Sequence, residues 1–196
     1  DQLQTQCPNL KRVSLVVGWF GDDLRAGHCT IRPGVERADK ATAPLAWSVA
    51  GLGRSGAHLI SRAPFGLSGH LPHEGGGDGP AYGGTPSDES VRQAVAALKA
   101  RGLEVTLYPF LLMDVPAGNG LPDPYGGAEQ AAYPWRGRVK GEEGTGAAAD
   151  VAALFGTSDG WGLRRFALHY AALAVETGAD GLLIGSEMRG VTTTRE

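Results

Sequence analysis

The chain has 196 residues, a length that suits one domain or part of a larger one. Its hydrophobic fraction of 42% and charged fraction of 20% are ordinary for a globular protein, so a core can be buried. The formal net charge of −3, without a basic block, argues against nucleic-acid binding, and no apolar run is long enough to insert into a membrane.

The two ends of the chain show no targeting pattern. No charged segment followed by an apolar stretch opens the sequence, so we expect synthesis in the cytoplasm without a signal peptide. Cys7 and Cys29 are the only cysteines; a single bridge is conceivable, but without a secretory signal free thiols are more common. The chain stops at Glu196, where a barrel would be starting its next helix, and we expect an excised piece of a longer protein.

The first regular element is a strand. Residues 12–20 are β-branched and almost continuously apolar, which is typical of a buried strand, and they lead into Asp22. No helical periodicity follows between Ala26 and Arg62, where residues 29–32, 46–49 and 58–61 are expected to form short strands. Either of the last two could be the second strand of a barrel.

A helix and a strand follow residue 84. Thr85 is placed to cap the helix, Pro86 to occupy its first position, and Asp88 to complete a capping pair. Apolar residues recur at helical spacing up to Leu98, and residues 104–113 then form a strand that leads into Asp114. Pro109 lies in the middle of that strand and predicts a bulge or an early end to its pairing.

The segment from residue 115 to residue 143 is loop-like, and an unstructured loop of this length is uncommon unless it is functional. It contains Tyr133, Trp135 and Arg136 among carboxylates and amides, a mixture that suits the faces and hydroxyls of sugars. The alternative is that the aromatic residues pack back onto the domain for stability.

The last apolar run carries the strongest catalytic candidate. A helical stretch from Trp161 to Thr177, stopped by Gly178, leads into the apolar residues 182–184 and then into Glu187. In parallel α/β barrels the loops at the carboxyl ends of the strands build the active site, which makes Glu187 a catalytic candidate. The alternative is a surface salt bridge between Glu187 and Arg189.

Alternation of buried strands with helices predicts an α/β fold with parallel pairing and right-handed crossovers. The elements amount to about four βα units, which is the N-terminal half of a (β/α)8 TIM barrel with long loop insertions, in one partial domain over residues 1–196. An open doubly wound sheet is the competing topology.

Four stretches carry a resemblance to a known family: residues 82–86 (YGGTP), 108–114 (YPFLLMD), 133–138 (YPWRGR) and 184–187 (IGSE). With them, the chain resembles the glycoside-hydrolase-like TIM-barrel domain of the tail, or host-specificity, proteins of gene transfer agents and related phages. The resemblance implies a retaining glycosidase, in which the acid/base Glu follows the fourth strand and the nucleophile follows the seventh.

In that comparison Glu187 matches the acid/base, and the nucleophile lies outside this chain. Many such glycosidases have Asn directly before the acid/base to hold the sugar 2-hydroxyl, and this chain has Ser186. No cofactor is implied, and the spacing of His70, His73 and Glu74 fits no helical zinc motif. The residues expected to bind the sugar are Asp22, Asp114, Trp135, Arg136 and Ser186.

The implied partners are a cell-envelope polysaccharide, peptidoglycan or capsule, and the other tail or particle proteins at the cell surface. We expect the isolated fragment to be inactive, since retaining hydrolysis needs two carboxyl groups, and to self-associate through its open sheet edge. A non-catalytic glycan-binding or structural tail module is the main alternative. A weaker one is an enzyme with a metal at Asp22, Asp114 and Glu187.

Overall fold

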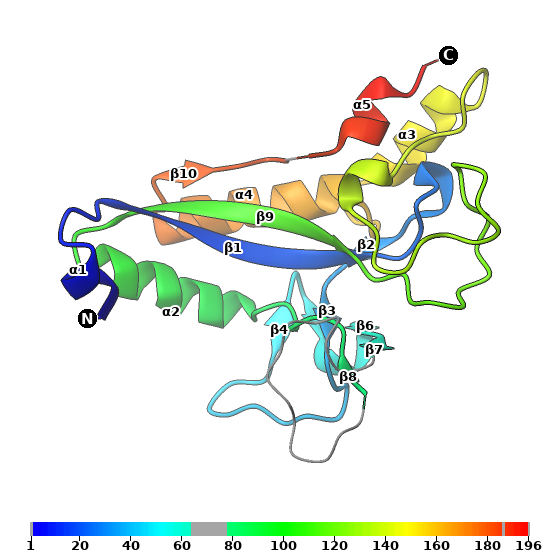
Figure 1. Ribbon diagram of the computed structural model, residues 1–196. Helices are drawn as coiled ribbons and strands as arrows, with labels where there is room; N and C mark the ends of the chain where they lie inside the picture. The colour runs from blue at the N-terminus through cyan, green and yellow to red at the C-terminus, as the bar shows by residue number, and fades with distance from the viewer. Residues whose placement is uncertain (1, 64–77, 186, 196) are drawn as a thin grey trace.

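The computed structural model describes residues 2–63, 78–185 and 187–195, and it is a mixed α/β fold built on a curled sheet (Figure 1). The strand order is β10-β9-β1-β2. β1 (Arg12–Gly21), β9 (Glu104–Met113) and β10 (Gly181–Leu182) are parallel, and β2 (Ile31–Arg32) pairs antiparallel with the end of β1. The predicted parallel pairing is therefore confirmed for three strands in chain order.

The strand β9 runs straight through Pro109. It stays in register with β1 over its whole length, with Val17 opposite Pro109. β10 pairs with β9 only at Thr106 and Leu107, so Pro109 lies where β9 has a single partner strand. A proline, which lacks the N–H donor, is tolerated there. The predicted bulge or early end of pairing is therefore wrong for β1 and β9, which stay paired on both sides of Pro109.

Two helices cover one face of the sheet. α2 (Asp88–Lys99) and α4 (Leu163–Thr177) both contact β9, and α4 ends at Gly178, whose φ of +65° gives the left-handed conformation that glycine adopts without strain. Alternate strand residues point toward these helices because side chains on a strand alternate between faces. The buried core on this side comprises Val17, Trp19, Val105, Leu107, Leu111 and Met113 from the strands with Val91, Val95, Phe166, Tyr170 and Leu173 from the helices.

Among the described residues, the opposite face of the sheet is covered near the carboxyl ends of β1 and β9. There Phe20 and Leu112 pack against Ile60, Ala63 and Ala81. Further toward the amino ends the same face is open, and Val16 is 54% exposed. In a closed barrel this face would point to the interior.

Short strands form a separate lobe between β1 and α2 (Figure 1). They are β3 (Gly34–Val35), β4 (Ser48–Val49), β5 (Leu52–Gly53), β6 (His58–Leu59), β7 (Arg62–Ala63) and β8 (Gly79–Pro80). They pair as β3-β6, β4-β5 and β7-β8, outside the main sheet. The prediction that residues 46–49 or 58–61 form the second barrel strand is therefore wrong, because β9 occupies the position beside β1.

The remaining elements are short helices and turns. They are α1 (Gln2–Gln6), η1 (Ala26–His28), η2 (Arg54–Gly56), η3 (Arg136–Arg138), α3 (Ala147–Phe155) and α5 (Arg189–Thr193). In the predicted long loop from 115 to 143, the regular structure is limited to η3 and to a single β-bridge between Lys140 and Arg25. Within the described part of the chain, every helix is too short or too polar to cross a membrane.

The start of α2 differs from the expectation. Ser87, and not Thr85, is the N-cap, and its hydroxyl accepts a hydrogen bond from Ser90 N at 3.1 Å. Thr85 is buried instead, where its hydroxyl donates to Gly18 O on β1 at 2.6 Å and accepts from Gly34 N in the lobe at 3.0 Å. Thr85 therefore joins the lobe to the sheet.

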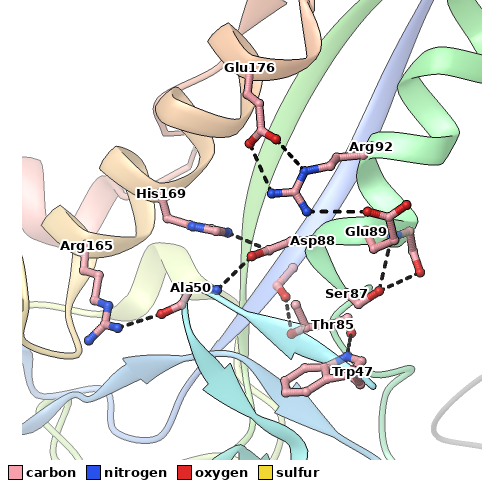
Figure 2. A network of polar contacts seen from close by, with 12 residues as sticks. Trp47, Ala50, Thr85, Ser87, Asp88, Glu89, Arg92, Arg165, His169 and Glu176 are labelled. Carbon is pink, nitrogen blue, oxygen red and sulfur yellow. Dashed lines mark hydrogen bonds and ion pairs between the residues drawn. The ribbon is translucent and has the colours of Figure 1, made fainter. Parts of the chain in front are cut away.

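A polar network fixes α2, α4 and the lobe to one another (Figure 2). Asp88 accepts from Ala50 N at 3.1 Å and pairs with His169 Nε2 at 2.9 Å. Arg92 forms a two-pronged ion pair with Glu176, at 2.7 and 3.1 Å. These contacts lie on the helix side of the sheet, away from the residues expected to bind sugar, and we assign them a structural role.

Candidate functional site

The candidate site lies where the parallel strands end. Asp22 directly follows β1 and Asp114 directly follows β9, and because these strands are parallel and in register, both carboxylates lie at the same edge of the sheet. Glu187 lies five positions after the end of β10 at Leu182. Ser186 and the residues His70, His73 and Glu74 lie outside the described residues.

Glu187 is held by two donors from the long loop. Trp135 Nε1 donates to Glu187 Oε2 at 2.8 Å, and Arg136 Nη2 forms an ion pair with the same oxygen at 2.7 Å. The Arg136 guanidinium is buried and lies over the ring of Phe110, 3.6 Å from its centroid. The structure thus brings Glu187 together with Trp135 and Arg136, two predicted site residues that lie about fifty positions earlier in the sequence. The predicted alternative, a pair between Glu187 and Arg189, is not the contact seen.

This cluster is accessible and conformationally special. The Glu187 side chain is 53% exposed, and Trp135 is 48% exposed with one side of its indole against Gly137. Glu187 also has a φ of +57°, which is unusual for a residue with a side chain. Backbone strain of this kind costs about 1–3 kcal/mol and tends to occur at functional sites. In this geometry Glu187 acts as a hydrogen-bond acceptor beside an open aromatic ring.

Asp114 sits in a second, buried cluster. Its Oδ2 contacts His58 Nε2 at 2.6 Å and accepts from Ser61 N at 2.9 Å, while its Oδ1 accepts from the Ser61 hydroxyl at 2.6 Å. Burial alone would raise the pKa of Asp114, but these hydrogen bonds and the proximity of His58 outweigh it and hold the pKa below 3.8. Its side chain is only 1% exposed, so the predicted contact with sugar would require displacing one of these donors.

His58, Ser61 and Asp114 have the residue types of a nucleophilic triad, but not its connections. In a triad the histidine bonds the serine hydroxyl and the aspartate bonds the other ring nitrogen. Here the aspartate is in the middle and accepts from both partners. The Ser61 hydroxyl donates a hydrogen bond to Asp114 and none to His58. His58 therefore cannot act as the base that would make Ser61 a nucleophile.

Asp22 lies beside this cluster on the His58 side. Its Oδ1 accepts from Thr30 N at 2.7 Å. Burial raises the pKa of Asp22, an effect that the Thr30 hydrogen bond and the nearby charges of His58 and Arg32 only partly offset. His58 therefore has two carboxylates near it: Asp114, which it contacts, and Asp22 within electrostatic reach.

Tyr133 connects the two clusters. Its hydroxyl lies 3.2 Å from Ser61 Oγ and its backbone N–H donates to Val115 O at 2.7 Å, with a φ of +48°. Trp135 is two residues further along, so Tyr133 and Trp135 cannot be more than about 7 Å apart along the backbone. The Asp114 cluster and the Glu187 cluster are therefore neighbouring parts of one edge.

Sequence reasoning missed His58 and Ser61. Residues 58–61 were expected to form a strand, and neither spacing nor motif distinguishes these two side chains from ordinary strand residues. Their position depends on the pairing of β6 with β3, which places the lobe against the end of β9. No local signal in the sequence predicts that contact.

The carboxylates at this edge do not form a cluster of metal ligands among the described residues. The part of the chain that the structure describes has no group of three or more His, Cys, Asp or Glu side chains placed to hold a metal ion, and so gives no support to a metal at Asp22, Asp114 and Glu187. A cavity of about 360 Å³ lies beside the start of α2, and one of about 550 Å³ lies between η1 and α3, lined in part by Arg25.

The position of Glu187 in the fold differs from the family expectation. Counted from β1, the strand before Glu187 is the third parallel strand, because β9 follows β1 directly in the sheet. The resemblance implied an acid/base after the fourth. Within the described residues the match of Glu187 to that role therefore rests on its sequence and not on the strand count.

Comparison with known proteins gives one partial match. Residues 161–196 match the model of the GTA TIM-barrel-like domain, and this segment holds α4, β10, Glu187 and α5. No curated protein matches the chain significantly. The C-terminal segment is thus similar to a TIM-barrel-like domain related to gene transfer agents, and it contains both the strand and the carboxylate on which the candidate site depends.

Proposed function

We propose that this chain contributes a glycan-binding surface to a gene-transfer-agent-related or phage-tail host-specificity protein that acts on a cell-envelope polysaccharide, peptidoglycan or capsule. The observation that supports it is the joint placement of Trp135, Arg136 and Glu187, with a half-exposed indole beside a half-exposed carboxylate. The match of residues 161–196 to the GTA TIM-barrel-like domain supports the particle context.

The chemistry of this surface suits sugars. An indole ring offers an apolar face to the C–H face of a pyranose, and Glu187 offers acceptor oxygens to its hydroxyls. Arg136 is buried beneath, where its contacts with Phe110 and Glu187 fix the carboxylate in place. Such a surface needs no deep pocket, because a polysaccharide lies along an open edge.

A second candidate function is retaining glycoside hydrolysis, with Glu187 as the acid/base and the nucleophile outside this chain. The positive φ of Glu187 favours it, because a strained backbone is retained where a side chain must be aimed. The second carboxyl group would have to approach within about 5–5.5 Å of Glu187 to attack the anomeric carbon. The acid role also requires a proton on a carboxyl group that here accepts two hydrogen bonds, so Arg136 would have to move or exchange its partner.

One experiment distinguishes these functions. The experiment measures two quantities on purified peptidoglycan and capsule: binding and the release of reducing sugars. It compares this chain and a protein extended through the full barrel, each with its Glu187→Gln variant. Glu143→Gln is the control, since Glu143 is a more exposed glutamate that pairs with Lys140 at 3.2 Å.

Binding that Glu187→Gln weakens, without release, supports the glycan-binding surface. Release by the extended protein that Glu187→Gln abolishes supports the glycosidase. Absence of binding by both wild-type proteins contradicts the proposal.

A further inference from the structure

We propose that His58 is a second sugar-contacting residue, which extends the Trp135 surface along the same edge of the sheet. This inference rests on the proposed glycan-binding function. It assigns a contact to a residue of the lobe, outside the barrel-like sheet.

The first support is the fixed orientation of the imidazole. Asp114 is ionised and can only accept, so His58 Nε2 must carry the hydrogen that it places 2.6 Å from Asp114 Oδ2. Phe20 stacks on the ring, with the centroids 5.9 Å apart. These two contacts hold the ring in one position, which is a requirement for a binding residue.

The second support is the ring nitrogen that remains. The other ring nitrogen, Nδ1, has no hydrogen-bond partner among the residues that the structure describes, so it is free to pair with a sugar hydroxyl, which can both donate and accept. The His58 side chain is 15% exposed, whereas the Asp114 side chain is 1% exposed. Of this pair, only His58 is therefore reachable by a ligand.

The third support is the neighbourhood. Asp22 supplies a further carboxylate near His58, so the subsite presents acceptors to a ligand rich in O–H or N–H donors, such as a hydroxylated or N-acetylated sugar. Tyr133 lies between this subsite and Trp135, and its hydroxyl is bonded to the Ser61 that also holds Asp114.

NMR titration with the monosaccharide and the tetrasaccharide of N-acetylglucosamine tests the proposal. The affinities are measured for the wild-type protein and for four variants: His58→Ala, His58→Asn, Ser61→Ala and Trp135→Ala. We expect both His58 variants to weaken tetrasaccharide binding about tenfold while leaving monosaccharide binding unchanged. Trp135→Ala should weaken both. Ser61→Ala is the matched control, because it removes a contact to Asp114 without removing a ligand contact.

Equal losses in Ser61→Ala and His58→Ala would show a structural effect and overturn the proposal, as would unchanged tetrasaccharide binding in the His58 variants. In either case the loss in Trp135→Ala leaves the proposed function standing. Wild-type protein that binds neither sugar also overturns this inference, whereas the proposed function is decided by the binding of purified peptidoglycan and capsule. A separate readout needs no sugar: long-range 1H–15N spectra should show His58 with its hydrogen on Nε2, and a hydrogen on Nδ1 alone would also overturn the proposal.

Discussion

Replacing Asp114 by Asn removes the charge from a buried carboxyl group that accepts three hydrogen bonds, two from Ser61 and one from His58. The amide keeps one acceptor oxygen, and its NH2 group must face at least one of these donors. Leaving a buried donor unpaired costs about 1–3 kcal/mol, and the remaining bonds weaken because their acceptor is no longer charged. We expect a loss of about 3 kcal/mol in the free energy of unfolding at pH 7.

The same residue predicts a pH dependence. The pKa of Asp114 is lower in the folded protein than its ordinary value of 3.8, so the stabilisation is fully present above that value and is lost as the pH falls through the lowered pKa. The stability difference between wild type and Asp114→Asn should therefore be constant from about pH 7 to pH 5 and should shrink below about pH 4.

Urea denaturation followed by tryptophan fluorescence measures both effects. With a urea dependence of about 2 kcal/mol per molar, the expected loss shifts the midpoint by about 1.5 M. Asp39→Asn is the control, because Asp39 is an exposed aspartate paired with Arg37, and its replacement should change the midpoint little. A midpoint of Asp114→Asn equal to that of wild type at pH 7, or a difference that persists unchanged below pH 4, would refute the reasoning.

Three further predictions concern packing. Gly137→Ala places a methyl group where the Trp135 ring lies. We therefore expect about fivefold weaker sugar binding, an effect of about 1 kcal/mol, with little loss of stability. Unchanged affinity in an NMR titration would contradict this prediction. Gly190→Ala forces its methyl group against the carbonyl of Val139 and should detach α5 from η3, seen as faster amide exchange of residues 189–193; exchange as slow as in wild type would count against this. Val16→Lys should reduce self-association through the open sheet face, and a wild-type chain that is strictly monomeric in sedimentation equilibrium would refute that expectation.

The elements that the sequence predicts well are those with a local signal. The apolar run of β1, the helical periodicity of α2 and α4 and the glycine at 178 are all visible in windows of a few residues, and each matches an observed element. The bulge or early end predicted from Pro109 is wrong for the pairing with β1, which continues in register through Pro109.

What could not be predicted depends on contacts between distant residues. Thr85 has the residue type of a helix cap, but its hydroxyl is taken by Gly18 on β1, and Ser87 caps the helix instead. The lobe strands are each two residues long, too short for a periodic signal, so nothing local shows that they leave the main sheet.

The candidate site divides in the same way. The apolar pattern of each strand predicts that Asp22, Asp114 and Glu187 lie just after strand ends. In the structure all three follow a strand of the main sheet. The partners of each carboxylate do not follow: Arg136 reaches Glu187 and His58 reaches Asp114 only because separate loops fold onto the same edge. Whether these residues bind sugar stays a prediction.

The direct pairing of β1 with β9 has a consequence for how the chain folds. Arg12 and Glu104, the first partners in this register, are 92 positions apart in the sequence. A contact of this range forms late, because the intervening chain must first be brought to closure, and parallel strands have no tight turn to start the pairing. During synthesis the apolar β1 leaves the ribosome long before its partner does. We therefore expect slow folding, with a period in which β1 is open to aggregation and to chaperone binding.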